Sequence, residues 1–149
     1  MEIERKFIPL TPPVSLESCP YHDIEQAYLS ESPAIRVRKE DSIFYLTYKN
    51  GAAMAHEEYN LPLTEAAYQS LLAKCDGRVL TKRRYLIPYG PYTIELDVFS
   101  APFDGLRIAE VEFPSVEEAE AFEKPDWFGE EVTSDRRYRN SYLALSPEI

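Results

Sequence analysis

The chain begins MEIERK (residues 1–6), and this stretch decides how the rest of the sequence is interpreted. Side chains alternate between two faces along a β-strand, so a strand here puts Glu2, Glu4 and Lys6 on one face. Two carboxylates and an ammonium group do not form an apolar core. Such a face is suited instead to bind a metal ion and an anion.

Pairs of like charges at positions i and i+2 recur along the chain, and an apolar residue separates the two charges in all pairs but one. The pairs are Glu2/Glu4, Arg36/Arg38, Lys82/Arg84, Glu95/Asp97 and Glu110/Glu112. Lys49 ends a further strand-like segment, on the same face as Tyr45 and Thr47. Most of these segments therefore have one charged face and one apolar face.

Two arrangements are compatible with this pattern. The charged faces either lie in solvent, as in many antiparallel sheets, or point inward around a closed barrel. Solvent faces usually mix both signs with Ser, Thr and Gln, so five unmixed pairs favour the inward arrangement. Burial of a bare ion costs on the order of 20 kcal/mol in the Born limit, so such an interior must contain water and balanced charges.

Eight segments have the composition of strands, and three have the signals of helices. The strands are expected at residues 1–8, 23–30, 34–40, 43–49, 57–63, 79–88, 92–99 and 106–113. Thr64 caps a helix through residue 74, Ser115 and Glu118 form a capping box for residues 116–124, and a last helix starts near Ser134. The stretch 9–20 is the least readable and is compatible with a short helix. The sequence predicts one α+β domain, residues 1–149: an eight-stranded antiparallel closed β-barrel, a tunnel with a charged interior and helices packed outside.

The residue types indicate the chemistry of the interior. Carboxylates from several strands suit Mg²⁺ or Mn²⁺, and Arg and Lys match phosphate oxygens. His22 and His56 stand alone, without the spacing of a metal site. With only 5 glycines, a glycine-rich phosphate loop is not expected, so side chains would have to hold the phosphate.

Composition limits the partners and the location. A formal net charge of −10 argues against a nucleic-acid surface but allows a local basic pocket for a small anion. There is no apolar run of about 18 residues and no secretory signal, so we expect a cytoplasmic protein without a membrane partner. Cys19 and Cys75 are expected to be ordinary thiols, and both a monomer and a homodimer remain open.

The ordered set of motifs resembles the CYTH family, also called the triphosphate tunnel metalloenzymes. The matching segments are EIERK (residues 2–6), QAYL (26–29), RVR (36–38), LTYK (46–49), KRRY (82–85), ELD (95–97), AEVEF (109–113) and WFGEEVTSDRRYRN (127–140). One departure concerns the fifth strand, where Glu58 is followed by Asn60 rather than by a second acid, which weakens Glu58 as a metal ligand.

The resemblance implies a tunnel that binds a triphosphate and divalent cations, and a metal-dependent inorganic triphosphatase that converts tripolyphosphate to pyrophosphate and phosphate. Lys6, Arg36, Arg38, Lys49, Lys82 and Arg84 would bind phosphate; Glu2, Glu4, Glu110 and Glu112 would hold a first Mg²⁺ or Mn²⁺, and Glu95 and Asp97 a second. Lys82, Glu4 and Arg38 are the expected catalytic residues. Tyr28, Asp135, Tyr138 and Asn140 are expected to be structural, with Asp135 as a helix cap.

Three other functions fit the same tunnel. A class IV-type adenylate cyclase would need a pocket for adenine, and no residue set demands one. A thiamine or nucleoside triphosphatase would need an aromatic platform, which 11 tyrosines allow without indicating it. A non-catalytic polyphosphate-binding module would keep the basic pairs but would not need all the acidic ones.

Overall fold

The computed structural model describes residues 1–51 and 54–146, and within these residues nine strands form one sheet. No helix among them is long and apolar enough to span a bilayer. The strands are β1 (Glu2–Pro9), β2 (Tyr21–Ser30), β3 (Ala34–Glu40), β4 (Ile43–Gly51), β5 (Ala55–Leu63), β6 (Asp76–Tyr89), β7 (Tyr92–Phe99), β8 (Arg107–Glu112) and β9 (Phe128–Glu131). The α-helices are α1 (Glu65–Leu72), α2 (Val116–Ala121) and α3 (Asn140–Leu145), and two 3₁₀ turns are η1 (Leu16–Ser18) and η2 (Arg136–Tyr138).

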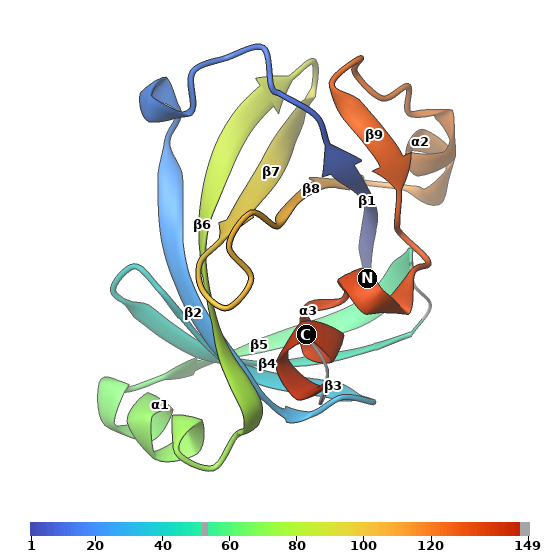
Figure 1. Ribbon diagram of the computed structural model, residues 1–149. Helices are drawn as coiled ribbons and strands as arrows, with labels where there is room; N and C mark the ends of the chain where they lie inside the picture. The colour runs from blue at the N-terminus through green and yellow to red at the C-terminus, as the bar shows by residue number, and fades with distance from the viewer. Residues whose placement is uncertain (52–53, 147–149) are drawn as a thin grey trace.

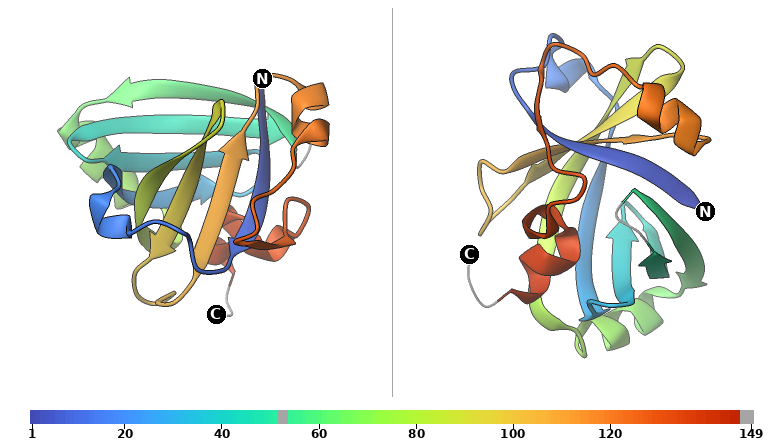
Figure 2. Two further views of the ribbon diagram at one scale, coloured as in Figure 1. Left: turned by 90° about the horizontal axis from the view of Figure 1, so that it is seen from above. Right: turned by 90° about the vertical axis from the view of Figure 1, so that its right-hand side faces the viewer.

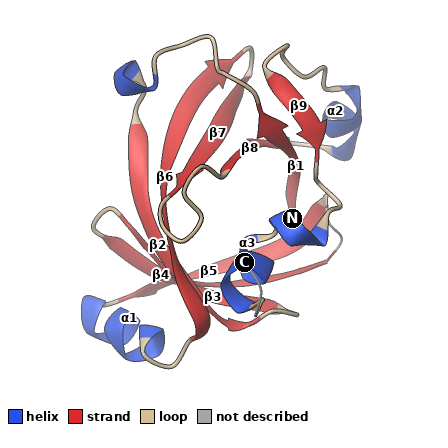
Figure 3. Ribbon diagram, viewed as in Figure 1, coloured by secondary structure: helices blue, strands red, loops and turns tan. Residues whose placement is uncertain are grey.

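Eight of these strands close into an antiparallel barrel, as predicted (Figures 1 and 3). The order around the barrel is β5-β4-β3-β2-β6-β7-β8-β1, and β1 returns to β5. This closing seam is short, because it pairs only Glu2 with His56 and Ile3 with Ala55. A further backbone bond of 2.9 Å, from Glu4 N to Met54 O, extends the seam. The closure therefore brings the first acidic pair next to β5.

The ninth strand was not predicted. β9 pairs with the second half of β1, Phe7 with Glu131 and Pro9 with Phe128, where β5 has separated from β1. It has four residues, too few for the alternation that identifies a strand from sequence. The short helix considered between residues 9 and 20 is the 3₁₀ turn η1.

The helix signals are largely confirmed. Thr64 Oγ1 accepts from Ala67 N at 3.1 Å and Ser115 Oγ from Glu118 N at 3.2 Å, so both predicted N-caps form. The last helix begins later than predicted, at the end of a segment that contains η2. Asp135 does act as a cap, but for η2. α1 and α2 lie at the periphery on opposite sides of the barrel (Figures 1 and 2).

The barrel has the inverted polarity that the sequence predicts. The spacers Ile3, Val37, Leu96 and Val111, which separate like charges, are buried. Ile3, Leu96 and Val111 join a core with Phe128 of β9 and with Val116 and Ala119 of α2, outside the wall formed by β1, β7 and β8. The apolar residues therefore stabilise the barrel from outside and leave the charged side chains on the interior face.

One end of the barrel interior is apolar, which the sequence analysis did not predict. Leu80, Phe99 and Ile108 are cross-strand neighbours of inward-facing residues, and they form a second core with Leu143 and Ala144 of α3. The charged faces thus become apolar two residues beyond Lys82, Asp97 and Glu110. α3 packs against this end of the barrel and closes it.

Gly77 and Arg78, at the start of β6, fix the position of α3. Gly77 has φ +68°, and a Cβ there would lie 2.0 Å from Ala144 O. Arg78 Nη1 donates to Leu143 O at 3.0 Å and to Ser146 O at 2.6 Å, which satisfies carbonyls at the end of the helix. Only glycine permits this close approach of the two backbones.

We predict that Gly77→Ala destabilises the protein more than Gly90→Ala. Both glycines have positive φ, but a Cβ at Gly90 meets nothing within 4 Å. Gly90→Ala should therefore cost about 1 kcal/mol, and Gly77→Ala about 3 kcal/mol because α3 must also move. Chemical denaturation of both variants measures the difference, and equal losses would contradict the close packing of α3.

Candidate active site

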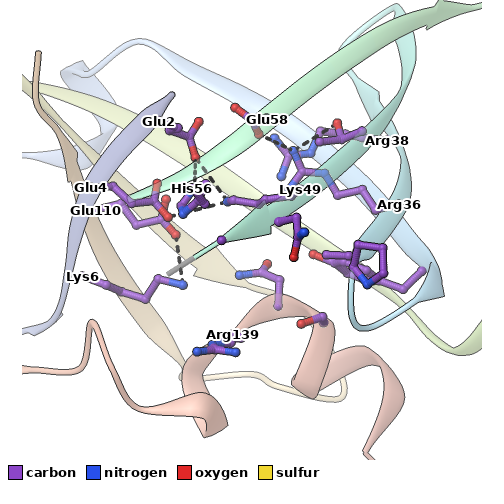
Figure 4. A pocket seen from close by; sticks show the side chains of 18 of the residues that line it. Glu2, Glu4, Lys6, Arg36, Arg38, Lys49, His56, Glu58, Glu110 and Arg139 are labelled. Carbon is purple, nitrogen blue, oxygen red and sulfur yellow. Dashed lines mark hydrogen bonds and ion pairs between the residues drawn. The ribbon is translucent and has the colours of Figure 1, made fainter. Parts of the chain in front are cut away.

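The interior holds a cavity of about 500 Å³ that is lined mainly by charged side chains. Figure 4 shows them converging from β1, β3, β4, β5 and β8, with Arg139 of the C-terminal segment beside them. All six predicted phosphate-binding residues line it, as do Glu2, Glu4, Glu95, Glu110 and Glu112. Asp97 is the one predicted site residue that does not. The structure thus brings together side chains that are spread over the whole chain.

One wall of the cavity is acidic. Glu4 of β1 lies opposite Glu112 of β8 in the sheet register, and Glu95 of β7 lies opposite Glu110. Burial and the neighbouring Glu110 raise the pKa of Glu4, and burial raises the pKa of Glu95 to about 7. In Glu110, attraction from Lys6 and Arg84 outweighs burial and lowers the pKa to about 2. The wall therefore carries more carboxylates than its cations can neutralise.

The opposite wall is basic and comes mainly from β3 and β6. Arg36 is 9% exposed, and its Nε has no hydrogen-bond partner among the described residues. Its charged contacts are long, with Nη2 at 3.7 Å from Glu58 Oε1. Burial, Arg36 and Arg84 together lower the pKa of Arg38. A buried guanidinium with an unpartnered donor, next to other cations, is a site that an anion would stabilise.

Lys49 and Lys6 pair with carboxylates of the acidic wall. Lys49 Nζ lies 3.2 Å from Glu2 Oε1 and 3.7 Å from Glu4 Oε1, and Lys6 Nζ lies 3.6 Å from Glu110 Oε1 (Figure 4). Each ammonium group thus contacts the acidic wall and also lines the cavity. These lysines hold the acidic wall together and face the space where an anion would lie.

His56 is a residue that sequence analysis missed. Its Nε2 lies 2.6 Å from Glu2 Oε1, and donor atoms of Glu2, Glu4 and His56 all lie within 4.8 Å of one another. His56 and Glu58 are two positions apart in β5, so both lie on its interior face. This spacing is the feature of the sequence that could have identified His56. Only the closing seam between β1 and β5 brings His56 against the acidic pair, however.

Glu58 also belongs to the cavity, although its departure from the family pattern weakened it as a candidate. Burial and a hydrogen bond with Glu2 raise the pKa of Glu58 to about 7. Asn60 accepts from Thr47 Oγ1 at 2.6 Å, so the residue that replaces the common acid is bonded within the wall.

The arrangement does not fit the expectation that Asp97 is a metal ligand. Asp97 is 1% exposed, and its two oxygens accept from Arg84 at 2.8 and 3.0 Å. Lys82 Nζ lies 2.7 Å from Oδ2 of the same carboxylate. Both oxygens of Asp97 therefore pair with Lys82 and Arg84, and the carboxylate lies behind these two cavity-lining side chains. Sequence alternation placed Asp97 on the correct face but could not give its depth.

The remaining acidic wall has the donors that a hard divalent cation prefers. Glu2, Glu4, Glu110 and Glu112 provide carboxylate oxygens, the ligand type of Mg²⁺ and Mn²⁺, and His56 adds a nitrogen. Burial and the charge of Glu2 raise the pKa of Glu112, as repulsion does at Glu4. A cation would relieve this repulsion, so the donor set fits such an ion.

No protein-family model matches the chain. An inorganic triphosphatase of Nitrosomonas europaea is 38% identical over 97% of the chain and 97% of its own length. A second inorganic triphosphatase, of Acetivibrio thermocellus, is 38% identical over 80% of the chain and 77% of its length.

The chain belongs to the family of these inorganic triphosphatases. The crystal structure of an inorganic triphosphatase superposes with a TM-score of 0.73 at 35% identity, covering 98% of this chain and 95% of the other. A putative adenylate cyclase of Bacillus halodurans superposes with a TM-score of 0.60 at 20% identity, over 81% of this chain and 84% of the other. This second likeness shows that the fold is shared.

The raised pKa values predict how the stability of the metal-free protein depends on pH. Glu58 and Glu95 have pKa values of about 7, against 4.5 for an ordinary glutamate. Between these values the folded state binds more protons than the unfolded state, so the free energy of unfolding falls as pH rises from about 4.5 to 7. Thermal unfolding in chelator should show a decreasing Tm over this range.

Glu58→Gln and Glu95→Gln should each flatten this decrease, whereas the exposed Glu120→Gln on α2 should not change it. A Tm that stays constant or rises between pH 5 and 7 in the unsubstituted protein would contradict the raised pKa values of Glu58 and Glu95 in the folded state.

Proposed function

We propose that this chain is a metal-dependent inorganic triphosphatase of the CYTH type, which hydrolyses tripolyphosphate to pyrophosphate and phosphate. The observation that carries the proposal is the cavity with one acidic and one basic wall, in a chain that is 38% identical over its length to an inorganic triphosphatase. Tripolyphosphate is a small, highly charged anion, so the local basic wall can bind it although the protein as a whole has a net charge of −10.

The basic wall would bind the phosphate chain. Arg36, Arg38, Lys49, Arg84 and Lys6 provide cationic donors around the cavity. Bidentate arginine contacts fix the orientation of a phosphate group, and lysine adds a point charge. The loose transition state of phosphoryl transfer spreads its charge over oxygens, so positioned cations are the main catalytic contribution.

The acidic wall would hold the divalent cation through Glu2, Glu4, Glu110 and Glu112, with Glu95 as a candidate for a second ion. A bound Mg²⁺ or Mn²⁺ supplies charge neutralisation at phosphate oxygens and lowers the pKa of a bound water. His56, bonded to Glu2 at 2.6 Å, orients that carboxylate. Asp97 is assigned instead to hold Lys82 and Arg84 in place.

Lys82 would stabilise the leaving pyrophosphate. Burial lowers its pKa to about 7, although Asp97 opposes this effect. A triphosphate in the cavity adds negative charge next to Lys82 and raises its pKa again. Substrate binding would therefore keep Lys82 as an ammonium group, which can balance charge on the departing oxygen.

The proposal is tested by incubation of the purified protein with tripolyphosphate, ATP and thiamine triphosphate, with Mg²⁺, with Mn²⁺ and with chelator. Metal-dependent release of phosphate from tripolyphosphate, faster than from the organic triphosphates, supports it. Formation of cyclic AMP would identify a cyclase instead, and tight binding without product would identify a binding module.

We predict that Glu4→Gln reduces divalent-dependent phosphate release by at least about 100-fold, because it removes a charged ligand from the metal site. The metal-free fold should be retained, since the pKa of Glu4 is already raised by burial and by Glu110. Steady-state kinetics and thermal unfolding check both statements, with Glu120→Gln as the control. Unchanged turnover would exclude Glu4 as a ligand.

Arg38→Ala should raise the KM for tripolyphosphate by about 10- to 100-fold, the value of one or two charge-assisted hydrogen bonds. Arg83→Ala is the matched control, because Arg83 lies on the outside of the barrel, with 43% of its side chain exposed, and pairs with Asp23. An unchanged KM and kcat in Arg38→Ala would remove Arg38 from the anion site.

A further inference from the structure

Asn140, the first residue of α3, is linked to two cations of the basic wall by a chain of hydrogen bonds. Its Oδ1 accepts from Lys82 Nζ at 2.9 Å and from Gln26 Nε2 at 2.9 Å. Gln26 Oε1 in turn accepts from Arg38 Nε at 2.7 Å. Gln26, Lys82 and Arg38 are 0%, 2% and 5% exposed, so water cannot easily replace these contacts.

The Arg38 end of this chain fixes the direction of every bond in it. A guanidinium can only donate, so Arg38 must face an acceptor. Gln26 therefore turns its oxygen to Arg38 and its NH₂ group to Asn140, and Asn140 turns its oxygen to both donors. Only one assignment of the two side-chain amides satisfies all members, which gives the network a single arrangement.

The position of α3 does not depend on this network. Leu143 and Ala144 are buried in the second core, and Arg78 holds the carbonyls at the end of the helix. Asn140 lines the cavity at the other end of the helix. Its polar contacts with the barrel are thus separate from those that dock α3.

We propose that Asn140 is a positioning residue, which orients Lys82 directly and Arg38 through Gln26 for contact with the substrate. The inference rests on the proposed function and adds to it a role for α3, which otherwise closes one end of the barrel. Asp97 holds Lys82 from the opposite side with an ion pair of 2.7 Å, so Lys82 is fixed between two elements. Removal of the Asn140 oxygen leaves the buried NH₂ group of Gln26 without its acceptor, so Gln26 loses the contact that holds its oxygen against Arg38.

Kinetics on the full chain with tripolyphosphate and Mg²⁺ form the first part of the test. Asn140→Ala should lower kcat by at least 10-fold. Asn140→Asp keeps an acceptor for both donors, so it should retain most of kcat, and its added negative charge in the cavity should raise KM. Leu145→Ala is the control on the same helix, because Leu145 packs against the second core without a place in the network.

Proton NMR of the arginine Nε–H groups, with Arg38 assigned through Arg38→Lys, forms the second part and needs no activity. Asn140 does not contact Arg38, so a merely structural role would leave the Arg38 Nε–H signal unchanged. We expect Asn140→Ala to shift this signal and to speed its exchange with water, and we expect Asn140→Asp and Leu145→Ala to preserve it.

The inference is overturned if Asn140→Ala leaves the Arg38 signal as in the unsubstituted protein, or if Leu145→Ala changes it as much. It is also overturned if Asn140→Ala keeps kcat within threefold. An unsubstituted chain that fails to hydrolyse tripolyphosphate would reject the proposed function alone, because the NMR comparison still decides whether Asn140 positions Arg38.

Discussion

The structure depends on a balance between opposite charges that share one enclosed, wet space. Buried ions are costly unless they are paired and hydrated, so neither wall of the cavity would be stable without the other. Lys49 and Lys6 show how the balance is reached, because each ammonium group lies within 4 Å of carboxylates from other strands. The balance is incomplete at Arg36 and Glu4, and this residual charge is what a metal ion and a polyphosphate would neutralise.

The inverted polarity moves the hydrophobic stabilisation to the outside of the wall. The apolar residues between like charges, such as Ile3 and Val111, pack against α2 and β9 rather than against each other across the barrel. The same strands that position the charges are thus held rigidly from behind. At one end the interior faces become apolar at Leu80 and Phe99, and α3 fills the space. A rigid wall and a closed end together limit how far the buried cations can move.

Much of the fold and the site was predictable, because alternation along a strand is a local property. The pairs Glu2/Glu4 and Arg36/Arg38 were placed on one face from spacing alone, and the order of the motifs indicated the family. Three features were not predictable. β9 is too short to show alternation, α3 closes one end of the barrel through contacts of residues far apart in sequence, and Asp97 lies behind the cavity because Lys82 and Arg84 cover it.

Residues that share a face, the sign of charge on each strand and the ligands that those side chains suit all follow from local sequence. Which faces meet depends on how the chain folds. Closure between β1 and β5 places His56 against Glu2, and the docking of α3 places Asn140 against Lys82. Both contacts join residues more than 50 positions apart. The physical reason is that side-chain direction follows from the local backbone, whereas depth and partnership depend on how distant strands close into a barrel.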